Sequence, residues 1–375
     1  MTDSTNDALA RISATGVSVW LDDLSRDALQ DGTLAELIAS KHVVGVTTNP
    51  TIFAKAVSEG HAYDAQLAEL GAAGTSVDDA VLRVTTDDVR SACDLFAATY
   101  EATGGKDGRV SIEVDPRLAH DTEGTIAAAS WLWRTVDRPN VMIKIPATPE
   151  GLPAITAAIG AGISVNVTLI FSLDRYRAVA QAYVDGLEHA EAAGIDLSTI
   201  RSVASLFLSR IDAKVDAALD EVGGSAAAEL RGTAAIANAR LAYEIYEEVF
   251  TTPRFAALAG ANRQRPLWAS TGTKDKAYPD TMYVDELVTS DVVSTMPRAT
   301  LEAVADHSPA TGDDVVRGTY EASREQLDEI ARLGVPYDQI LADLETAGVE
   351  SFEKSWAELL ETITTGLAGD ARADA

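Results

Sequence analysis

A single lysine interrupts one of the most apolar stretches of the chain. The segment "NVMIKIPATPEG" (140–151) alternates branched aliphatic residues with Lys144 and its neighbours, the period-2 pattern of a β-strand. A buried ammonium group is costly unless it is paired, and the chain has only eight lysines. Burial also favours the free amine form of a lysine, which attacks carbonyl carbons to form a Schiff base, whereas nearby carboxylates oppose this effect. Lys144 is therefore a candidate nucleophile.

Further polar side chains share one face of short β-branched runs elsewhere in the chain. Alternation places them opposite the Val, Ile and Leu residues of each run, and hence toward the interior of a closed sheet. They are Asp22, Asn49, Glu113, Lys144, Asn166, Thr168 and Ser205. A lone Ser or Asp in such a place is usually structural, but seven polar residues from so many runs favour a common site. The same alternation predicts that Trp268 and Ser270 also point inward.

These residue types suit one kind of chemistry. A Schiff-base reaction needs groups that move protons, and Asp22 and Glu113 are the inward carboxylates. The five histidines are scattered without an H-x-x-x-H pair, and no Ser-His-Asp or Cys-His arrangement has a matching context. The pattern therefore predicts a metal-free, lysine-dependent enzyme acting on a carbonyl compound. A purely structural ion pair between Lys144 and Glu113 stays open as the alternative.

Eight short apolar runs could position these side chains. They alternate with longer Ala-, Leu- and Glu-rich segments typical of helices, and they cover 17–23, 43–50, 109–116, 141–147, 163–171, 200–210, 266–271 and 291–297. Eight strands alternating with helices predict an α/β fold, a single (β/α)₈ TIM barrel, with its site at the carboxyl ends of the strands. An open doubly wound sheet is the second choice, because no G-x-G-x-x-G turn follows the first run.

No low-complexity linker divides the chain, so residues 1–375 are expected to form one domain. The chain is longer than a typical barrel of roughly 250 residues. We expect the additional residues in extra helices after the second strand and in a C-terminal helical extension over about 313–369. Within that extension, "ESFEKSWAELLETI" places Phe352, Trp356, Leu359 and Leu360 on one helical face.

Charge and composition exclude several classes of protein. The formal net charge of -28 argues against binding nucleic acid or an anionic membrane, and an anionic substrate would need cations gathered locally. The sequence contains no run of 18 or more apolar residues, so no membrane span is expected. The N-terminus is polar and acidic, and it lacks the basic and then apolar segments of a signal peptide. Cys93 is the only cysteine, so no intrachain disulfide is possible and a cytoplasmic location is expected.

Five segments taken together resemble the transaldolase family over about residues 17–297. They are "GVTTNPTIF", "SIEVDPRL", "VMIKIPATPEG", "SVNVTLIFS" and the ending "STMP". The resemblance implies a cofactor-free barrel enzyme of the pentose phosphate pathway that acts on sugar phosphates. The sequence does not determine its oligomeric state, and a monomer or homodimer is expected. Such an enzyme moves a dihydroxyacetone unit from a ketose phosphate (sedoheptulose 7-phosphate or fructose 6-phosphate) to an aldose phosphate (glyceraldehyde 3-phosphate or erythrose 4-phosphate).

The resemblance also implies catalytic roles for four residues. Lys144 would form the Schiff base, and Asp22 would be the acid/base at the hydroxyl whose deprotonation starts carbon–carbon cleavage. Glu113 and Thr168 would hold the water that carries protons while the Schiff base forms and hydrolyses.

Six further residues would bind substrate if the resemblance holds. Asn49 and Asn166 would hold the dihydroxyacetone fragment, while Ser205 and Arg210 of "SLFLSR" would contact the substrate, the arginine at its phosphate. After the seventh strand the chain reads "ASTGTKDK" where the family usually has an aromatic residue and then a phosphate-binding arginine. Ser270 and Lys274 are the expected substitutes there, although Lys274 could also be an ordinary surface lysine.

Two other functions remain open at this stage. A fructose 6-phosphate aldolase would use the same Schiff-base lysine, but related aldolases carry Tyr at the place of Phe207 and are much shorter. A non-catalytic sugar-phosphate binder would form no covalent adduct and would tolerate Lys144→Met.

Overall fold

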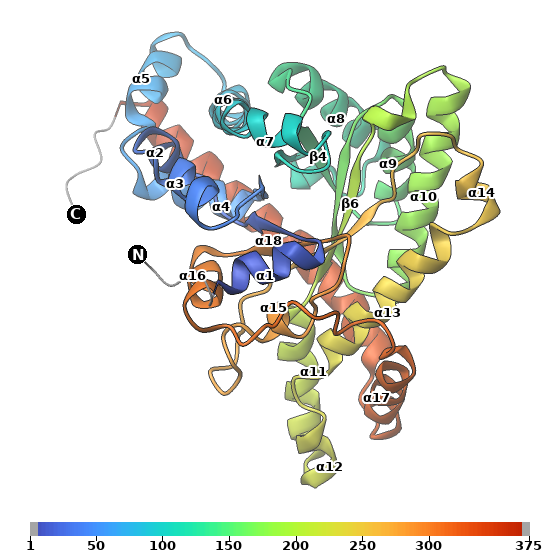
Figure 1. The fold of residues 1–375 in the computed structure, drawn as a ribbon. Coiled ribbons are helices and arrows are strands. Elements are labelled where there is room, and N and C mark those ends of the chain that lie inside the picture. Colours follow the sequence, from blue (N-terminus) through green and yellow to red (C-terminus); the bar gives the residue numbers. More distant parts are fainter. Residues whose placement is uncertain (1–6, 370–375) are drawn as a thin grey trace.

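Eight parallel strands close into a barrel in the computed structural model, which describes residues 7–369 (Figure 1). The strands are β1 (Val17–Leu21), β2 (Gly45–Val46), β3 (Arg109–Glu113), β4 (Val141–Pro146), β5 (Val165–Ile170), β6 (Ser202–Phe207), β7 (Arg265–Ala269) and β8 (Val292–Met296). Each strand pairs with the next along the chain, and β8 pairs with β1. The predicted (β/α)₈ barrel is confirmed, and the open doubly wound sheet is excluded.

The second strand is much shorter than the run 43–50 from which it was predicted. Only Gly45 and Val46 pair on both sides, because Asn49 already caps the next helix and Pro50 begins it. The residue after this strand is still held against β1, since the Thr47 amide donates to the Leu21 carbonyl over 2.9 Å. A short strand thus delivers Thr47 and Asn49 to the end of the barrel.

Helices surround the barrel and fill the connections between strands. α1 (Ala8–Thr15) precedes β1, and α2 (Arg26–Gln30) and α3 (Thr33–Ser40) follow it. The predicted extra helices after the second strand are α4 (Pro50–Glu59), α5 (Asp64–Ala72), α6 (Val77–Leu95) and α7 (Ala97–Ala102). The later helices are α8 (Thr122–Val136), α9 (Gly151–Gly160), α10 (Leu173–Ala192), α11 (Ser209–Val222), α12 (Gly224–Glu229), α13 (Ala234–Val249), α14 (Pro253–Ala256), α15 (Met282–Asp285) and α16 (Arg298–His307). Short 3₁₀ helices cover Pro116–Leu118 and Leu197–Thr199.

The C-terminal extension consists of two helices, α17 (Tyr320–Arg332) and α18 (Tyr337–Leu367). Figure 1 shows α18 running behind the barrel from the side of α5 to the side of α17, and it contacts α4, α5, α6, α11 and β5. Phe352, Trp356 and Leu359 are buried on its inner face and Leu360 is half-buried, as the amphipathic pattern indicates. Within residues 7–369, no helix is both long and apolar enough for a bilayer.

The predicted direction of Trp268 is wrong. Leu267 and Ala269 of β7 line the barrel cavity, whereas the Trp268 indole points away and donates from Nε1 to the Leu287 carbonyl over 3.2 Å. Ser270 still lies in the cavity, because its backbone adopts a left-handed conformation (φ 56°) that ends the strand alternation. The predicted direction of Ser270 is therefore confirmed, although alternation from Trp268 does not produce it.

The close approach of β1 and β2 predicts the effect of one substitution. A Cβ atom at Gly45 would lie 2.6 Å from the buried indole of Trp20, whose Nε1 donates to Asp107. We therefore expect Gly45→Ala to lower the free energy of unfolding by about 1–3 kcal/mol, measured by urea denaturation. In the double variant Gly45→Ala/Trp20→Phe the smaller ring should make the two losses less than additive. Strict additivity would show that this contact does not limit packing.

Candidate active site

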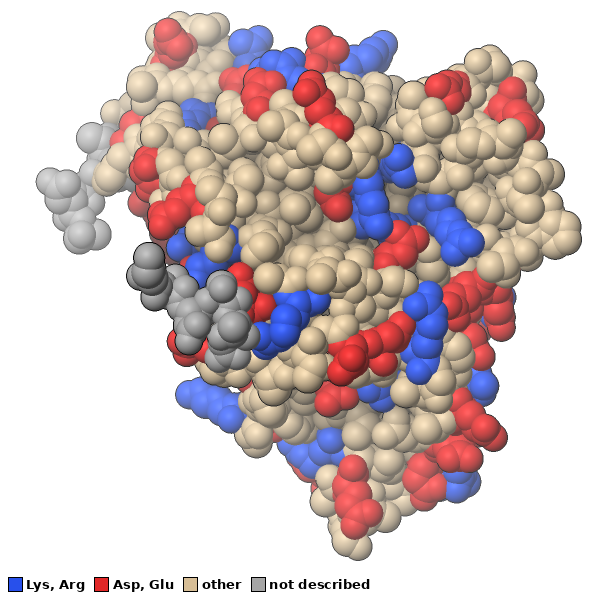
Figure 2. All heavy atoms as spheres, viewed as in Figure 1, with Lys and Arg blue, Asp and Glu red and all other residues tan. Residues whose placement is uncertain are grey.

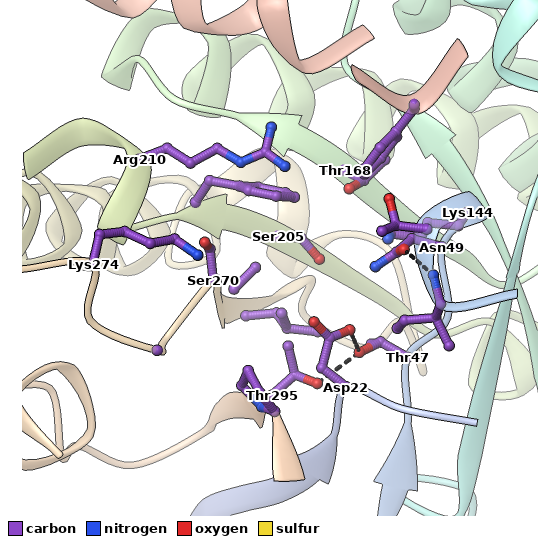
Figure 3. A pocket seen from close by; sticks show the side chains of 18 residues that line it. Asp22, Thr47, Asn49, Lys144, Thr168, Ser205, Arg210, Ser270, Lys274 and Thr295 are labelled. Atoms are coloured by element: carbon purple, nitrogen blue, oxygen red, sulfur yellow. Dashed lines mark hydrogen bonds between the residues drawn. The ribbon is translucent and has the colours of Figure 1, made fainter. Parts of the chain in front are cut away.

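A cavity of about 210 Å³ opens at the carboxyl ends of the strands (Figure 3). Eight of the ten predicted site residues line it, namely Asp22, Asn49, Lys144, Thr168, Ser205, Arg210, Ser270 and Lys274. The other two, Glu113 and Asn166, lie beside Lys144 on the neighbouring strands β3 and β5 and do not line this cavity. The barrel therefore brings the whole predicted set together at one end.

Lys144 lies in the middle of this arrangement and is only 4% exposed. Its Nζ atom is 3.3 Å from Oε2 of Glu113 and donates a hydrogen bond to the Thr48 carbonyl over 3.1 Å. The Phe352 ring of α18 also lines the cavity, and its centroid lies 5.6 Å from Nζ. The amine is thus held by one carboxyl group and one carbonyl, and it faces the cavity.

Glu113 is the titratable partner of this lysine. Burial raises the pKa of Glu113 to about 7, although the positive charge of Lys144 acts in the opposite direction. Its Oε2 atom makes no hydrogen bond within residues 7–369, and the ion pair with Lys144 is its polar contact. A carboxyl group with a pKa near neutrality can both give and take a proton, as general acid–base catalysis requires.

Asp22 lies across the cavity from Lys144 at the end of β1 (Figure 3). Thr47 donates to its Oδ1 over 2.7 Å, and the Thr47 and Thr295 hydroxyls are 2.6 Å apart. Because a hydroxyl carries one hydrogen, Thr295 must donate to Thr47 when Thr47 donates to the carboxylate. Burial raises the pKa of Asp22, while the charge of Lys144 and the Thr47 hydrogen bond favour its ionised form.

The two asparagine side chains of the predicted set differ in whether they reach the cavity directly. Asn49 uses Oδ1 to accept from the Ile52 amide at the start of α4, so its Nδ2 group is left to face the cavity. Asn166 is fully buried, donates to Ser111 and accepts from Ser205, whose hydroxyl lines the cavity. Asn49 can therefore donate directly to a bound molecule, whereas Asn166 orients Ser205.

Thr168 offers a polar group without a protein partner. Its Oγ1 atom is buried and makes no hydrogen bond among the described residues, and its side chain lines the cavity. Leu169, which follows, has a left-handed backbone (φ 58°), and the strand register shifts between Val167 and Ile170. This irregularity lies directly after Thr168, near the carboxyl end of β5 that faces the site.

Cationic side chains occupy the opposite end of the cavity from Lys144. Figure 3 shows Arg210 and Lys274 there, and neither forms an ion pair with a carboxylate in the part of the chain that the structure describes. Arg210 stacks on Phe207 with 5.4 Å from Cζ to the ring centroid, and burial lowers its pKa. Ser270 shares a 2.9 Å hydrogen bond with Ser209. This end suits the phosphate group of a substrate.

Comparisons with known proteins agree with this geometry. A family model described as "Transaldolase/Fructose-6-phosphate aldolase" matches residues 19–363. The chain belongs to this family. It is 60% identical to "Transaldolase 1" of Streptomyces avermitilis over 98% of this chain and 97% of that protein. It is also 60% identical to "Transaldolase" of Thermobifida fusca, over 96% and 98%, and to "Transaldolase" of Mycolicibacterium smegmatis, over 95% and 96%.

Ten residues that line the cavity were outside the predicted set, and three of them, Thr47, Thr295 and Phe352, belong to the contacts around Asp22 and Lys144. Thr47 follows the alternation of the run 43–50 but had no predicted role, and Thr295 was not considered. Phe352 was predicted on the apolar face of the C-terminal extension, and whether that helix covers the site was left open. Thr295 follows the same alternation within "DVVSTMP", so that signal was present. For Phe352 the helical pattern gave only its apolar face, because the helix lies far along the chain and packs onto the barrel only in three dimensions.

No group of three or more His, Cys, Asp or Glu side chains suited to hold a metal ion occurs within residues 7–369. The cavity residues supply amine, carboxyl, hydroxyl, amide and guanidinium groups instead.

The raised pKa of Glu113 predicts how folding stability depends on pH. Its folded pKa of about 7 lies above the ordinary value of 4.5, so protonation of this group favours the folded state and that stabilisation is lost as pH rises from about 4.5 to about 7. Glu113→Gln should remove this loss, which is on the order of 3 kcal/mol. Urea unfolding at several pH values measures it, with Glu358→Gln on the exposed face of α18 as the control. Equal pH dependence in wild type and Glu113→Gln would contradict the assignment.

Proposed function

We propose that this protein is a transaldolase, which transfers a dihydroxyacetone unit from a ketose phosphate to an aldose phosphate through a Schiff base on Lys144. The single observation that carries the proposal is the placement of Lys144. Its amine is buried, lies 3.3 Å from the Glu113 carboxyl and faces a cavity whose far end holds Arg210 and Lys274. Relatives that are 60% identical over nearly the full chain carry the name transaldolase.

The first step is attack of the Lys144 amine on the C2 carbonyl of the ketose phosphate. The resulting carbinolamine loses its hydroxyl as water, which requires a proton, and leaves a positively charged imine. Glu113 is the nearest acid, and its pKa of about 7 lets it give this proton and take it back on hydrolysis. The unpartnered Thr168 hydroxyl can hold the water molecule that passes protons between them.

The second step breaks the bond between C3 and C4. Asp22 takes the proton from the C4 hydroxyl, a C4 carbonyl forms, and the electron pair of the C3–C4 bond moves into the imine to give an enamine. The aldose phosphate leaves, and the same steps in reverse join the enamine to an acceptor aldehyde. Thr47 and Thr295 orient Asp22. Asn49 donates a hydrogen bond to the retained three-carbon unit, while Ser205, whose hydrogen goes to Asn166, accepts one from a substrate hydroxyl.

The alternative is a lyase that releases free dihydroxyacetone from fructose 6-phosphate. Release requires the enamine to be protonated and the imine hydrolysed without an acceptor. Phe207 lines the cavity between Arg210 and Phe171 and has no ionisable or hydroxyl group for such a proton transfer. The apolar ring therefore favours transfer over release.

The covalent step predicts a trapped adduct on Lys144. Incubation with fructose 6-phosphate and no acceptor, followed by borohydride reduction and peptide mass spectrometry, should find a reduced three-carbon adduct on Lys144. Lys144→Met should give none, whereas Lys55→Met, on the exposed surface of α4, should be labelled like wild type. Binding without any adduct would leave Lys144 as a structural cation. Continuous formation of free dihydroxyacetone would favour the lyase.

The cationic end of the cavity predicts a selective loss of affinity for phosphorylated substrates. Arg210→Gln should raise the KM for fructose 6-phosphate by about 10- to 100-fold, because a charge-assisted contact to phosphate is lost. Lys274→Gln should have a smaller effect, because its side chain is exposed. Neither change should alter the reaction with unphosphorylated fructose to the same extent. Lys214→Gln, on the exposed side of α11, is the control. Equal losses for both sugars would argue against a phosphate role.

A further inference from the structure

A second cavity, also of about 210 Å³, lies at the opposite end of the barrel. Its lining residues precede strands or begin them, whereas the candidate active site is built from residues at and beyond the strands' carboxyl ends. Arg109 and Arg265 are the first residues of β3 and β7, and Arg201 immediately precedes β6. The apolar part of its lining consists of Met142 and Val203, both buried, and Ala261. This amino-end cavity is therefore a separate site.

The amino-end cavity gathers positive charge in a strongly acidic protein. Its lining contains five cationic side chains, although the chain has a formal net charge of -28. Two of the cations are paired: Arg265 with Asp107 and Lys106 with Asp291, each over 3.0 Å. The others have no carboxylate partner among the residues that the structure describes, and they are Arg109, Arg201 and Arg263. These three arginines thus give the cavity about three positive charges that no carboxylate pairs with among residues 7–369.

Neutral oxygens satisfy some of these guanidinium hydrogen bonds but leave their charge in place. Arg109 is 1% exposed, donates to the Gly105 carbonyl over 2.7 and 2.9 Å, and lies over the Tyr100 ring. Arg201 donates to the Gly104 carbonyl over 3.0 Å and to Asn262. Burial lowers the pKa of Arg109 to about 10, and the like charges of Arg201 and Arg265 contribute to that shift. A bound anion would relieve this repulsion.

We propose that the amino-end cavity binds a small phosphate-bearing anion, either inorganic phosphate or a phosphate monoester. Guanidinium groups match phosphate oxygens with paired N–H donors, and three of them here lack a counter-charge.

The size and surroundings of the cavity favour a small ligand over a nucleic acid. Figure 2 looks onto the face where α1 lies in front of the barrel, and Lys and Arg side chains gather to the right of its centre, near α10 and α14. Acidic side chains are spread over much of the remaining visible surface. A long polyanion would meet these charges, whereas a single phosphate group meets only the cavity.

The test must separate this site from the candidate active site, which also offers cations to phosphate. We expect the full-length variant Arg210→Gln/Lys274→Gln to bind one equivalent of inorganic phosphate by isothermal titration calorimetry. Adding Arg201→Gln and Arg263→Gln should weaken this binding by about tenfold or more. Adding Arg83→Gln and Lys214→Gln, which remove the same charge from exposed positions on α6 and α11, should not. Equal phosphate affinity in both quadruple variants would overturn the proposal.

Two further measurements complete the test. Arg263→Gln alone alters an exposed side chain and should leave the thermal unfolding temperature unchanged while weakening phosphate binding in the Arg210→Gln/Lys274→Gln background. Glycerol 2-phosphate, a monoester without a carbonyl group, distinguishes the two sources of the ligand. Binding of both compounds assigns the site to monoesters, binding of phosphate alone assigns it to the free anion, and binding of neither overturns the proposal.

Discussion

The structure depends on holding one amine inside a closed barrel. Lys144 lies between Glu113 and Asn166 through the register of β3, β4 and β5, so its neighbours follow from the hydrogen bonding of the sheet. An ammonium group in this place needs a partner, and Glu113 is that partner at the cost of its own desolvation. The same burial that makes the pair costly raises the pKa of Glu113 to about 7 and makes it suitable for proton transfer.

The two ends of the barrel carry different arrangements of charge. At the carboxyl end, Lys144 and two carboxyl groups lie apart from the unpaired cations Arg210 and Lys274, so the proposed reaction centre and the proposed phosphate site occupy separate parts of one cavity. Regular alternation breaks at Leu169 and Ser270, both with left-handed backbone, next to side chains that line this cavity. At the amino end, arginine side chains gather instead, and carboxylates compensate only part of their positive charge. Apolar interior side chains such as Met142 lie between these polar layers.

Segments far apart along the chain complete the candidate active site. α18 places the centre of the Phe352 ring 5.6 Å from the Lys144 amine. Closure of the sheet brings β8 and β2 to either side of β1, so Thr295 of β8 contacts Thr47, which follows β2. These contacts exist only after the barrel has closed and the C-terminal extension has packed on it. The barrel provides the framework, but the direction of each loop and of α18 determines which side chains reach the cavity.

Period-2 alternation, a property of the extended backbone, was sufficient to predict eight strands and the inward direction of Asp22, Glu113, Lys144, Asn166 and Ser205. It failed for Trp268, which was placed on the same face as Ser270, because the left-handed backbone of Ser270 breaks the alternation and lets Ala269 and Ser270 both line the cavity. The residue types, and hence the possible chemistry, were determined by the sequence alone. The contacts of Thr47, Thr295 and Phe352, the raised pKa of Glu113 and the gathering of arginines at the amino end were decided by tertiary structure. Distance and desolvation have no local signature, since both arise only when separate strands and helices enclose the same space.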